Sequence, residues 1–279
     1  MMIPARDFDP QKIMESGQCF RMTENEKDWF VTAHKKRLRL SLEGDAVRLW
    51  CSEEEFDLLW RGYFDLDTNY AAFRAAIPSD DGYLGAAARF GEGIRILRQD
   101  PWEMLVTFLI SQRKNIPAIQ KAVETLCVRY GEPFDADGET AHAFPAPQAL
   151  ARLSRKELDA CSLGYRSPYV LAAARMAADG VLDFDALSHL DDNELLAALQ
   201  TVPGVGPKVA NCIALFGFHR LAGFPRDVWI NRVIDEHYGG AFPLERYEGF
   251  AGVMQQYLFF YARAKGRSAK KSSGEPCCC

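Results

Sequence analysis

The segment TVPGVGPKVANCIALF at residues 201–216 constrains this chain most, because a glycine-rich turn separates two patterns of helical periodicity. Gly204 and Gly206 permit backbone angles that other residues avoid, and they leave amide N–H groups uncovered by side chains. Pro207 suits the first position of the second helix. A turn of this kind at a helix N-terminus can hold a phosphate, and the plain alternative is a tight connection between packed helices.

The chain after this turn contains two side chains that could perform chemistry. Lys208 falls in the first turn of the second helix, where the helix dipole disfavours a cation. The position suits an amine that attacks carbon, because a nucleophilic lysine needs a lowered pKa. Asp227 precedes the apolar periodic run VWINRVI and is typical of a helix N-cap, so the sequence alone leaves a purely structural role open.

The string LQTVPGVGPKVANCIALF, followed by FPRDVW, resembles the helix-hairpin-helix DNA glycosylases, and its lysine resembles that of the 8-oxoguanine DNA glycosylase/lyases. The resemblance implies that Lys208 attacks C1′ of the damaged nucleotide and that Asp227 stabilises charge and assists. We therefore expect a base excision repair enzyme that flips out and removes 8-oxoguanine through a Schiff base and then nicks the abasic site by β-elimination. We expect no required cofactor and no metal site, apart from a structural monovalent cation at the hairpin.

The same resemblance implies a base-recognition pocket. SGQCFRM at residues 16–22 resembles the SGQ-[SC]-FRW signature of the family, in which the carbonyl of the glycine matching Gly17 contacts N7–H of 8-oxoguanine, a proton that guanine lacks. Gln255 and Phe259 are four residues apart and so share a helix face; they match the residues that read and stack on the base. Cys212, four residues after Lys208, matches the opposite wall, with a buried structural cysteine as the alternative.

Other matches imply contacts with the DNA strands, and they fall on Gly204, Gly206, Val209, Arg113, Asn115, Tyr165 and Arg166. In the QRKN loop at residues 112–115, Arg113 replaces the asparagine that, in the family, fills the space left in the duplex by the extruded base. In LGYR, the family's tyrosine wedges into the stack of DNA bases. The alternative for QRKN is that its side chains hold phosphates or are simply solvated. The alternative for the tyrosine is that it packs under a loop. The altered loop and Trp229, where animal members have histidine, lead us to expect relaxed selectivity for cytosine opposite the lesion.

The order of β-rich and helical segments along the chain predicts an α+β protein. Short β-rich runs between Phe8 and Trp50 predict an antiparallel sheet, and helical periodicity dominates afterwards. We expect an N-terminal antiparallel sheet domain with helices at residues 1–95, an all-α helix-hairpin-helix glycosylase core at 96–265 and a disordered tail at 266–279. The Pro- and Gly-rich stretch at residues 132–150 is expected to be a connecting loop.

Composition limits the partners. A net charge of −5 argues against a protein that coats nucleic acid through bulk electrostatics, so DNA contacts must be local. The eight cysteines form no CxxC pair, and the terminal CCC cannot supply four spaced thiolates to an iron–sulfur cluster. Acids at the N-terminus, where a signal peptide would be basic and then apolar, lead us to expect a cytosolic protein, nucleoid-associated if bacterial. We expect a monomer that binds double-stranded DNA containing an oxidised purine, and no membrane.

Two other functions fit parts of the pattern. A glycosylase of the same fold for alkylated bases is one, although such enzymes generally lack the lysine at position 208. The other is a non-catalytic helix-hairpin-helix DNA-binding module, for which Lys208→Gln would leave both activity and DNA affinity unchanged.

Overall fold

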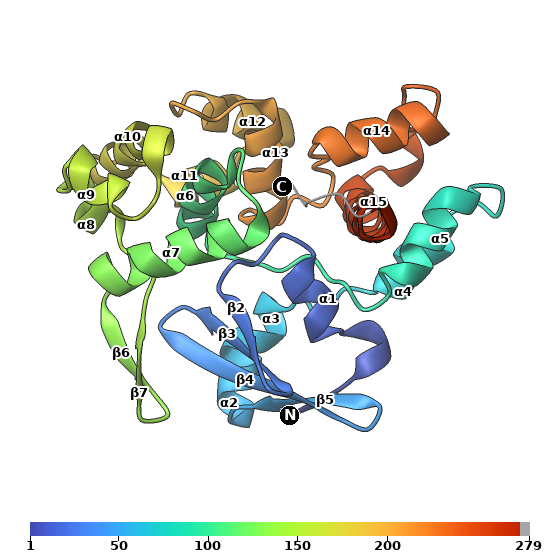
Figure 1. Cartoon of the computed structure of the whole chain (residues 1–279), viewed down its shortest axis with the longest axis horizontal. Helices are drawn as coiled ribbons and strands as arrows, with labels where there is room; N and C mark the ends of the chain where they lie inside the picture. The colour runs from blue at the N-terminus through green and yellow to red at the C-terminus, as the bar shows by residue number, and fades with distance from the viewer. Residues whose placement is uncertain (274–279) are drawn as a thin grey trace. The chain divides into compact units, whose positions relative to one another are not determined.

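The computed structural model describes residues 1–273 and contains one large sheet near the N-terminus (Figure 1). Its strands are β1 (Met2–Pro4), β2 (Met22–Asn25), β3 (Asp28–Ala33), β4 (Lys36–Glu43) and β5 (Ala46–Trp50), in the order β1-β5-β4-β3-β2. The pairs β1–β5 and β2–β3 are antiparallel, with Ile3 opposite Val47 and Thr23 opposite Phe30. The predicted antiparallel sheet and the α+β class are therefore confirmed.

The chain forms two compact units, each built from segments that are not contiguous in sequence. The first unit comprises residues 1–19, 40–98 and those from 219 onward, and the second comprises residues 20–39 and 99–218. We predicted two consecutive domains that meet between residues 95 and 96, which differs from this division. The difference arises because α15 (Ala251–Ser273) packs on α5 (Gly82–Phe90) and bonds the backbone of residues 15 and 16, a long-range pairing that no local pattern reveals.

The helices of the first unit lie between β1 and β2, after β5, and in the C-terminal part of the chain. They are η1 (Ala5–Asp7), α1 (Pro10–Glu15), α2 (Glu53–Glu55), the π-helix η2 (Phe56–Trp60), α3 (Arg61–Tyr63), α4 (Tyr70–Ala75), α5 (Gly82–Phe90), α14 (Val228–His237), η4 (Leu244–Tyr247) and α15 (Ala251–Ser273). Phe8 and Phe64 meet edge to face at 4.8 Å in its core. A side chain at Gly91 would lie 2.6 Å from the ring of Tyr257, so the chain after α5 approaches α15 as closely as glycine allows.

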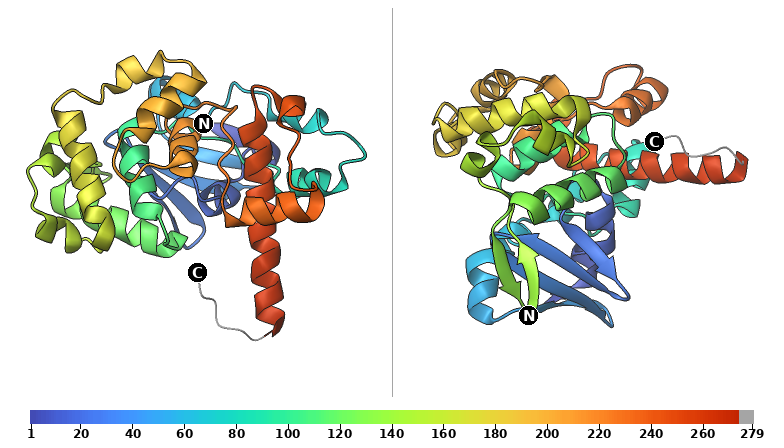
Figure 2. Two further views of the ribbon diagram at one scale, coloured as in Figure 1. Left: turned by 90° about the horizontal axis from the view of Figure 1, so that it is seen from above. Right: turned by 60° about the vertical axis from the view of Figure 1, so that its left-hand side comes forward.

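α15 is one uninterrupted helix, and it packs against α5 and α14 (Figure 2). Because it continues to Ser273, the expectation of a disordered tail from residue 266 is wrong for residues 266–273. The apolar run that we used to predict this helix ends at Arg263, and the polar continuation gave no separate helical signal. The rest of the expected tail, residues 274–279, lies outside the described residues.

The second unit is mostly helical. Its elements are α6 (Pro101–Ser111), α7 (Ile116–Tyr130), β6 (Pro133–Ala136), β7 (Glu139–His142), α8 (Pro147–Ala151), α9 (Arg155–Asp159), η3 (Gly164–Arg166), α10 (Ser167–Ala178), α11 (Phe184–Ser188), α12 (Asp192–Gln200) and α13 (Pro207–Phe216). α6 is buried along almost its whole length, as its apolar sequence predicted. Phe108 of α6 stacks on Phe216 of α13 at 5.6 Å, so the helix that carries Lys208 rests on the most buried helix of the unit.

Several elements were not predicted, among them a β-hairpin and a short helix. The expected loop after Gly131 contains the β6–β7 hairpin, whose turn residues Asp137 and Gly138 have φ of 55° and 85°. Positive φ at both central positions is what a tight hairpin turn needs, so the Asp-Gly pair was the available signal. α1 was also missed, although Asp9 caps it by accepting a hydrogen bond from the Lys12 amide at 3.0 Å and Pro10 occupies its first position.

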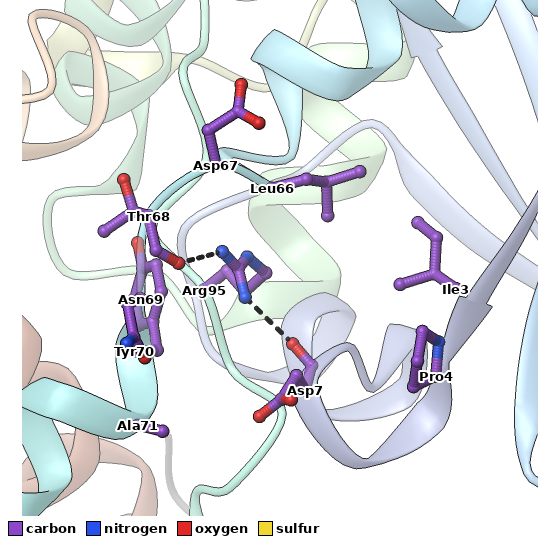
Figure 3. A pocket seen from close by; sticks show the side chains of 10 residues that line it. All are labelled: Ile3, Pro4, Asp7, Leu66, Asp67, Thr68, Asn69, Tyr70, Ala71 and Arg95. Atoms are coloured by element: carbon purple, nitrogen blue, oxygen red, sulfur yellow. Dashed lines mark hydrogen bonds between the residues drawn. The ribbon is translucent and has the colours of Figure 1, made fainter.

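The first unit also contains a cavity of about 340 Å³ (Figure 3). The guanidinium of Arg95 lies in its wall and donates to the carbonyls of Asp7 and Thr68, at 3.1 and 2.6 Å. None of the predicted site residues lines this cavity, so we assign it to the packing of the unit. No helix within residues 1–273 combines the length and the apolar character that crossing a bilayer requires.

Candidate active site

The helical hairpin predicted from the sequence is present in the second unit, where α12 and α13 pack together (Figure 1). α12 begins with the predicted capping box, in which Asp191 accepts from the Glu194 amide and Glu194 from the Asp191 amide, at 2.9 and 3.1 Å. Pro207 is the first residue of α13, and Gly206 occupies the N-cap position without a side chain to bond the first amides. The first-turn N–H groups of α13 are therefore not satisfied by a cap and can bind an anion.

Gly204 is required in the turn for two reasons. Its φ of +87° is a conformation that side chains other than glycine rarely adopt, and a Cβ atom there would lie 2.5 Å from Cγ of Tyr169. Its carbonyl accepts a hydrogen bond from Nε2 of Gln112 at 3.1 Å. Gly206 has neither constraint, since its φ is −93° and a Cβ would meet no atom within 4 Å.

Lys208 lies in the first turn of α13, and its side chain is exposed. Its ammonium group is 5.8 Å from the ring centroid of Phe108. This exposure leaves the amine accessible to a large substrate. Cys212 follows one turn later on α13 and is 3% exposed, so of this pair the lysine is the accessible member.

The QRKN loop lies between α6 and α7, and three of its four side chains are bound within the protein. Besides Gln112, Lys114 donates from Nζ to the Ser162 carbonyl at 2.8 Å, and Asn115 caps α7 by accepting from the Ala118 amide at 2.9 Å. Most of the polar side chains of the loop are therefore held by the protein itself. Arg113 is exposed and has a φ of +53°, so it is the side chain of the loop most available to a ligand.

Tyr165 and Arg166, in η3, meet this loop at the carbonyl of Gln112. The hydroxyl of Tyr165 donates to that carbonyl at 3.3 Å, and Nε of Arg166 donates to it at 2.7 Å. Tyr165 is 47% exposed whereas Arg166 is 7% exposed, with its guanidinium 4.2 Å from the Tyr165 ring centroid. Burial lowers the pKa of the nearby Lys114, and the positive charge of Arg166 lowers that pKa further.

Val209 is buried on α13, and the other four predicted residues belong to the first unit. Asp227 is the N-cap of α14, as predicted, and its Oδ1 accepts from the amides of Trp229 and Ile230 at 3.0 and 2.9 Å. Both bonds use the same oxygen, and the side chain is half-buried. The cap therefore fixes the carboxylate in one orientation while Oδ2 stays available to a ligand.

Gln255 and Phe259 lie one turn apart on α15. Gln255 is 5% exposed, and its Nε2 donates to the Pro225 carbonyl at 3.0 Å. A carbonyl can only accept, so this bond fixes the amide with Oε1 on its other side. Among the residues that the structure describes, no donor reaches Oε1, and a buried acceptor in that state is costly unless a ligand satisfies it. Phe259 is partly exposed.

Gly17 occupies a turn after α1 with a φ of +79°. Its neighbours Ser16 and Gln18 are 1% and 0% exposed, so the turn is firmly held although it lies outside a regular element. Across the described part of the chain, no group of three or more His, Cys, Asp or Glu side chains is arranged to hold a metal ion.

Comparison with known proteins identifies the family. Residues 1–105 match the model of the 8-oxoguanine DNA glycosylase N-terminal domain, and residues 106–242 match that of the HhH-GPD superfamily of base excision DNA repair proteins. A solved structure of MBOgg1 in complex with a low-affinity DNA ligand is 34% identical, with a TM-score of 0.89 over 95% of this chain and 96% of the other. The chain belongs to the 8-oxoguanine DNA glycosylase family of the HhH-GPD superfamily.

Two further relatives support this membership. The 8-oxoguanine glycosylase/lyase of Clostridium acetobutylicum, solved in complex with dsDNA containing cytosine opposite to 8-oxoG, is 32% identical with a TM-score of 0.88, covering 95% of this chain and 98% of the other. The probable N-glycosylase/DNA lyase of Methanothermobacter thermautotrophicus is 28% identical over 95% of this chain and 97% of its own length. The protein is accordingly an N-glycosylase/DNA lyase of the type that removes 8-oxoguanine in base excision repair.

Within this family assignment, the structure draws attention to Gln112, which the sequence did not single out. Its side chain holds the hairpin at Gly204, and its carbonyl receives both Tyr165 and Arg166. Four of the predicted DNA-contacting residues thus lie beside or are bonded to one glutamine, namely Arg113, Tyr165, Arg166 and Gly204. Only the position of Gln112 at the C-terminal end of a buried helix could have indicated this role.

Proposed function

We propose that Lys208 is the nucleophile of this glycosylase/lyase. Its neutral amine forms a bond to C1′ while the bond to the base breaks, and the base leaves with the bonding electron pair and takes up a proton. Loss of the remaining amine proton and opening of the sugar give a Schiff base. Removal of a proton from C2′ then expels the 3′ phosphate, which nicks the strand. The exposure of Lys208 beside a turn suited to bind phosphate supports this role.

Asp227 supports the same reaction electrostatically. As the base departs, positive charge develops on the sugar, and a fixed carboxylate stabilises such a charge without having to reorganise. The two amide bonds to Oδ1 hold the group in place, so that Oδ2 can face the sugar. The N-cap geometry therefore serves both the helix and the chemistry.

The base is recognised by Gly17, Cys212, Gln255 and Phe259. A stacked base is not accessible to an amine at C1′, so the nucleotide is turned out of the duplex first. The Watson–Crick edge of 8-oxoguanine presents two N–H donor groups, and the buried acceptor Oε1 of Gln255 lacks a donor among the described residues. Phe259 stacks on one face of the base, Cys212 forms the other wall, and the Gly17 carbonyl accepts N7–H.

Double-stranded DNA containing an oxidised purine is the substrate, and it is held by local contacts because the net charge is −5. The backbone amides around Gly204, Gly206 and Val209 bind a phosphate at the start of α13. Arg113 occupies the space left by the extruded base, Asn115 meets the DNA beside it while capping α7, and Tyr165 wedges into the stack. Because Arg113 stands where the family has asparagine and Trp229 where animal members have histidine, selectivity for the opposite cytosine is relaxed.

Borohydride trapping tests the nucleophile directly. Duplexes containing 8-oxoguanine opposite each of the four bases are incubated with the enzyme and reduced, and the covalent protein–DNA adduct is measured. Wild type should form the adduct and Lys208→Gln should not, whereas Lys27→Gln, which changes an exposed lysine in the β2–β3 turn, should behave as wild type. An adduct of normal yield in Lys208→Gln would assign the chemistry to another amine, and similar yields opposite all four bases would support the relaxed selectivity.

A further inference from the structure

The turn that presents the Gly17 carbonyl is bound by side chains from α15. Gln256 is 2% exposed, and its Nε2 donates to the carbonyl of Ser16 at 2.7 Å. Nη1 of Arg263 donates to the carbonyl of Glu15 at 2.9 Å. Gln256 and Arg263 are seven residues apart, about two helical turns, so both project from the same side of α15. The two peptide groups just before Gly17 are therefore each fixed by this helix.

The other side of the turn is fixed by Gln18. Its Nε2 donates to the Arg95 carbonyl at 2.8 Å and lies 3.0 Å from Oγ of Ser16, and its Oε1 accepts from the Leu97 amide at 2.9 Å. The planar peptide group before Gly17 is bonded at the Ser16 carbonyl, and the side chain of the next residue, Gln18, is fixed as well, so the Gly17 carbonyl has little freedom. That restraint matters because glycine, at a φ of +79°, has no side chain of its own to limit its backbone angles.

α15 also carries the predicted base contacts. Gln255 precedes Gln256 directly, and the guanidinium of Arg263 lies 5.6 Å from the ring centroid of Phe259. One rigid helix thus sets the position of the edge-reading amide, of the stacking ring and of the turn with the Gly17 carbonyl. A displacement of the turn would change the distance from Gly17 to the base without changing the distance from Gln255.

We propose that Gln256 and Arg263 are positioning residues that set the discrimination between 8-oxoguanine and guanine by aiming the Gly17 carbonyl at N7 of the base. This inference rests on the proposed role of Gly17. The N7–H of 8-oxoguanine donates to that carbonyl, whereas N7 of guanine opposes it with a lone pair. Because hydrogen bonds weaken steeply with misalignment, a looser turn loses the attraction for the lesion and the repulsion of the normal base together.

The test compares three substrates with full-length enzyme. Single-turnover rates are measured on duplexes containing 8-oxoguanine, guanine or an abasic site, each opposite cytosine. Gln256→Met keeps the shape and removes the donor; its ratio of 8-oxoguanine to guanine excision should fall about fivefold to tenfold. Nicking of the abasic duplex needs no base contact and should match wild type. Gln148→Met, at an exposed position of α8, should leave all three rates unchanged.

Arg263 gives a second, independent variant. Arg263→Met should lower the same ratio, and Arg263→Lys, which keeps a cationic donor, should restore part of it. If Gln256→Met is unfolded by circular dichroism, Arg263→Met decides the question by the same criterion. An unchanged ratio in a folded variant would overturn the proposal, and so would a parallel loss of abasic nicking, which indicates a general structural role.

Failure of the proposed function gives a different result. The covalent adduct on abasic DNA, lost in Lys208→Gln, reports on the nucleophile alone. If the wild-type enzyme excises guanine as fast as 8-oxoguanine, Gly17 does not discriminate between the two bases, whatever the variants do. The positioning role is overturned separately, when wild type discriminates and the folded variants discriminate equally well.

Discussion

The imidazole of His219 and the carboxylate of Asp65 form a buried hydrogen-bonded pair, with Nε2 of His219 3.2 Å from Oδ2 of Asp65. The same nitrogen is 3.2 Å from the Ile96 carbonyl, and since both partners are acceptors, it carries a proton. Nε of Arg98 donates to Oδ1 of Asp65 at 3.0 Å. Arg98 and His219 directly flank the segment 99–218, so one carboxylate binds the chain where it leaves the first unit and where it returns.

Replacing Asp65 should therefore destabilise the protein in a pH-dependent way. Burial raises the pKa of Asp65, but the hydrogen bond and charge of His219, with Tyr70 and Thr68, outweigh it, and the pKa is lowered from 3.8. The carboxylate thus contributes stability above that pH, and the contribution is lost as the pH falls through the folded pKa. Asp65→Asn should cost about 3 kcal/mol at pH 7, measured by urea unfolding, and less at pH 3.

Asp67 provides the matched control for this experiment. It also bonds an arginine, Arg61, at 2.7 Å, but the pair is exposed at the surface. Exposed ion pairs contribute little, so Asp67→Asn should leave the unfolding curve close to that of wild type at both pH values. Equal destabilisation by the two substitutions would show that the buried arrangement around Asp65 has no special role.

The two glycines of the hairpin turn should respond differently to alanine. Gly204→Ala introduces a Cβ that would lie 2.5 Å from Tyr169, at a φ of +87°, so it should lower the free energy of unfolding by about 2 kcal/mol. Gly206→Ala meets no atom within 4 Å, so only the poorer N-cap preference of alanine applies, and stability should fall by about 0.5–1 kcal/mol. Thermal unfolding of both variants checks the difference, and a Gly206 variant as unstable as the Gly204 variant would contradict it.

What the sequence could predict was mainly local. The caps at Asp191 and Asp227 and the helix start at Pro207 follow from residues within a few positions of each other, and all three are confirmed. The β6–β7 hairpin was missed although its Asp-Gly turn was visible, because the strands beside it are short and half-polar. Propensity was a weak guide where only cross-strand pairing stabilises an element.

The parts that could not be predicted depend on contacts between distant segments. Nothing near residue 16 indicates that Gln256 bonds its carbonyl across 240 positions. Likewise, the burial of Arg166 against the Gln112 carbonyl and the exposure of Lys208 are results of packing, not of local pattern. The family resemblance named which residues to examine, whereas their hydrogen-bond partners came only from the structure.

Glu103, at the start of α6, should make stability depend on pH near neutrality. Burial raises its pKa to about 7, although Arg21, 3.7 Å away, opposes the shift. A raised folded pKa contributes stability that is full below the ordinary value of 4.5 and is lost as pH rises through about 7. Glu103→Gln should therefore reduce the stability difference between pH 5 and pH 8 by about 2 kcal/mol. Urea unfolding measures this, with the exposed Glu124→Gln as control, and an undiminished pH dependence in Glu103→Gln would refute it.

Gln112 should control DNA affinity through the hairpin. Its Nε2 holds the Gly204 carbonyl at 3.1 Å, while its own carbonyl binds Tyr165 and Arg166 through the backbone. Gln112→Ala removes only the first of these bonds, so the fold should survive and the turn that binds phosphate should loosen. We expect the Kd for a duplex with a stable abasic-site analogue to rise about fivefold to tenfold, as loss of one hydrogen bond predicts.

The control for this substitution is Gln120→Ala, one helix further along the chain in α7, which should bind the duplex as wild type does. Titration of salt separates the two explanations for any loss of affinity. A loosened turn loses a phosphate contact made by amides, so the slope of log Kd against log salt should change little, because that slope reports the cations that replace counterions. A clearly shallower slope would instead show that Gln112 acts by placing Arg113 or Arg166 on the DNA, and unchanged affinity would show that Gly204 needs no side-chain support.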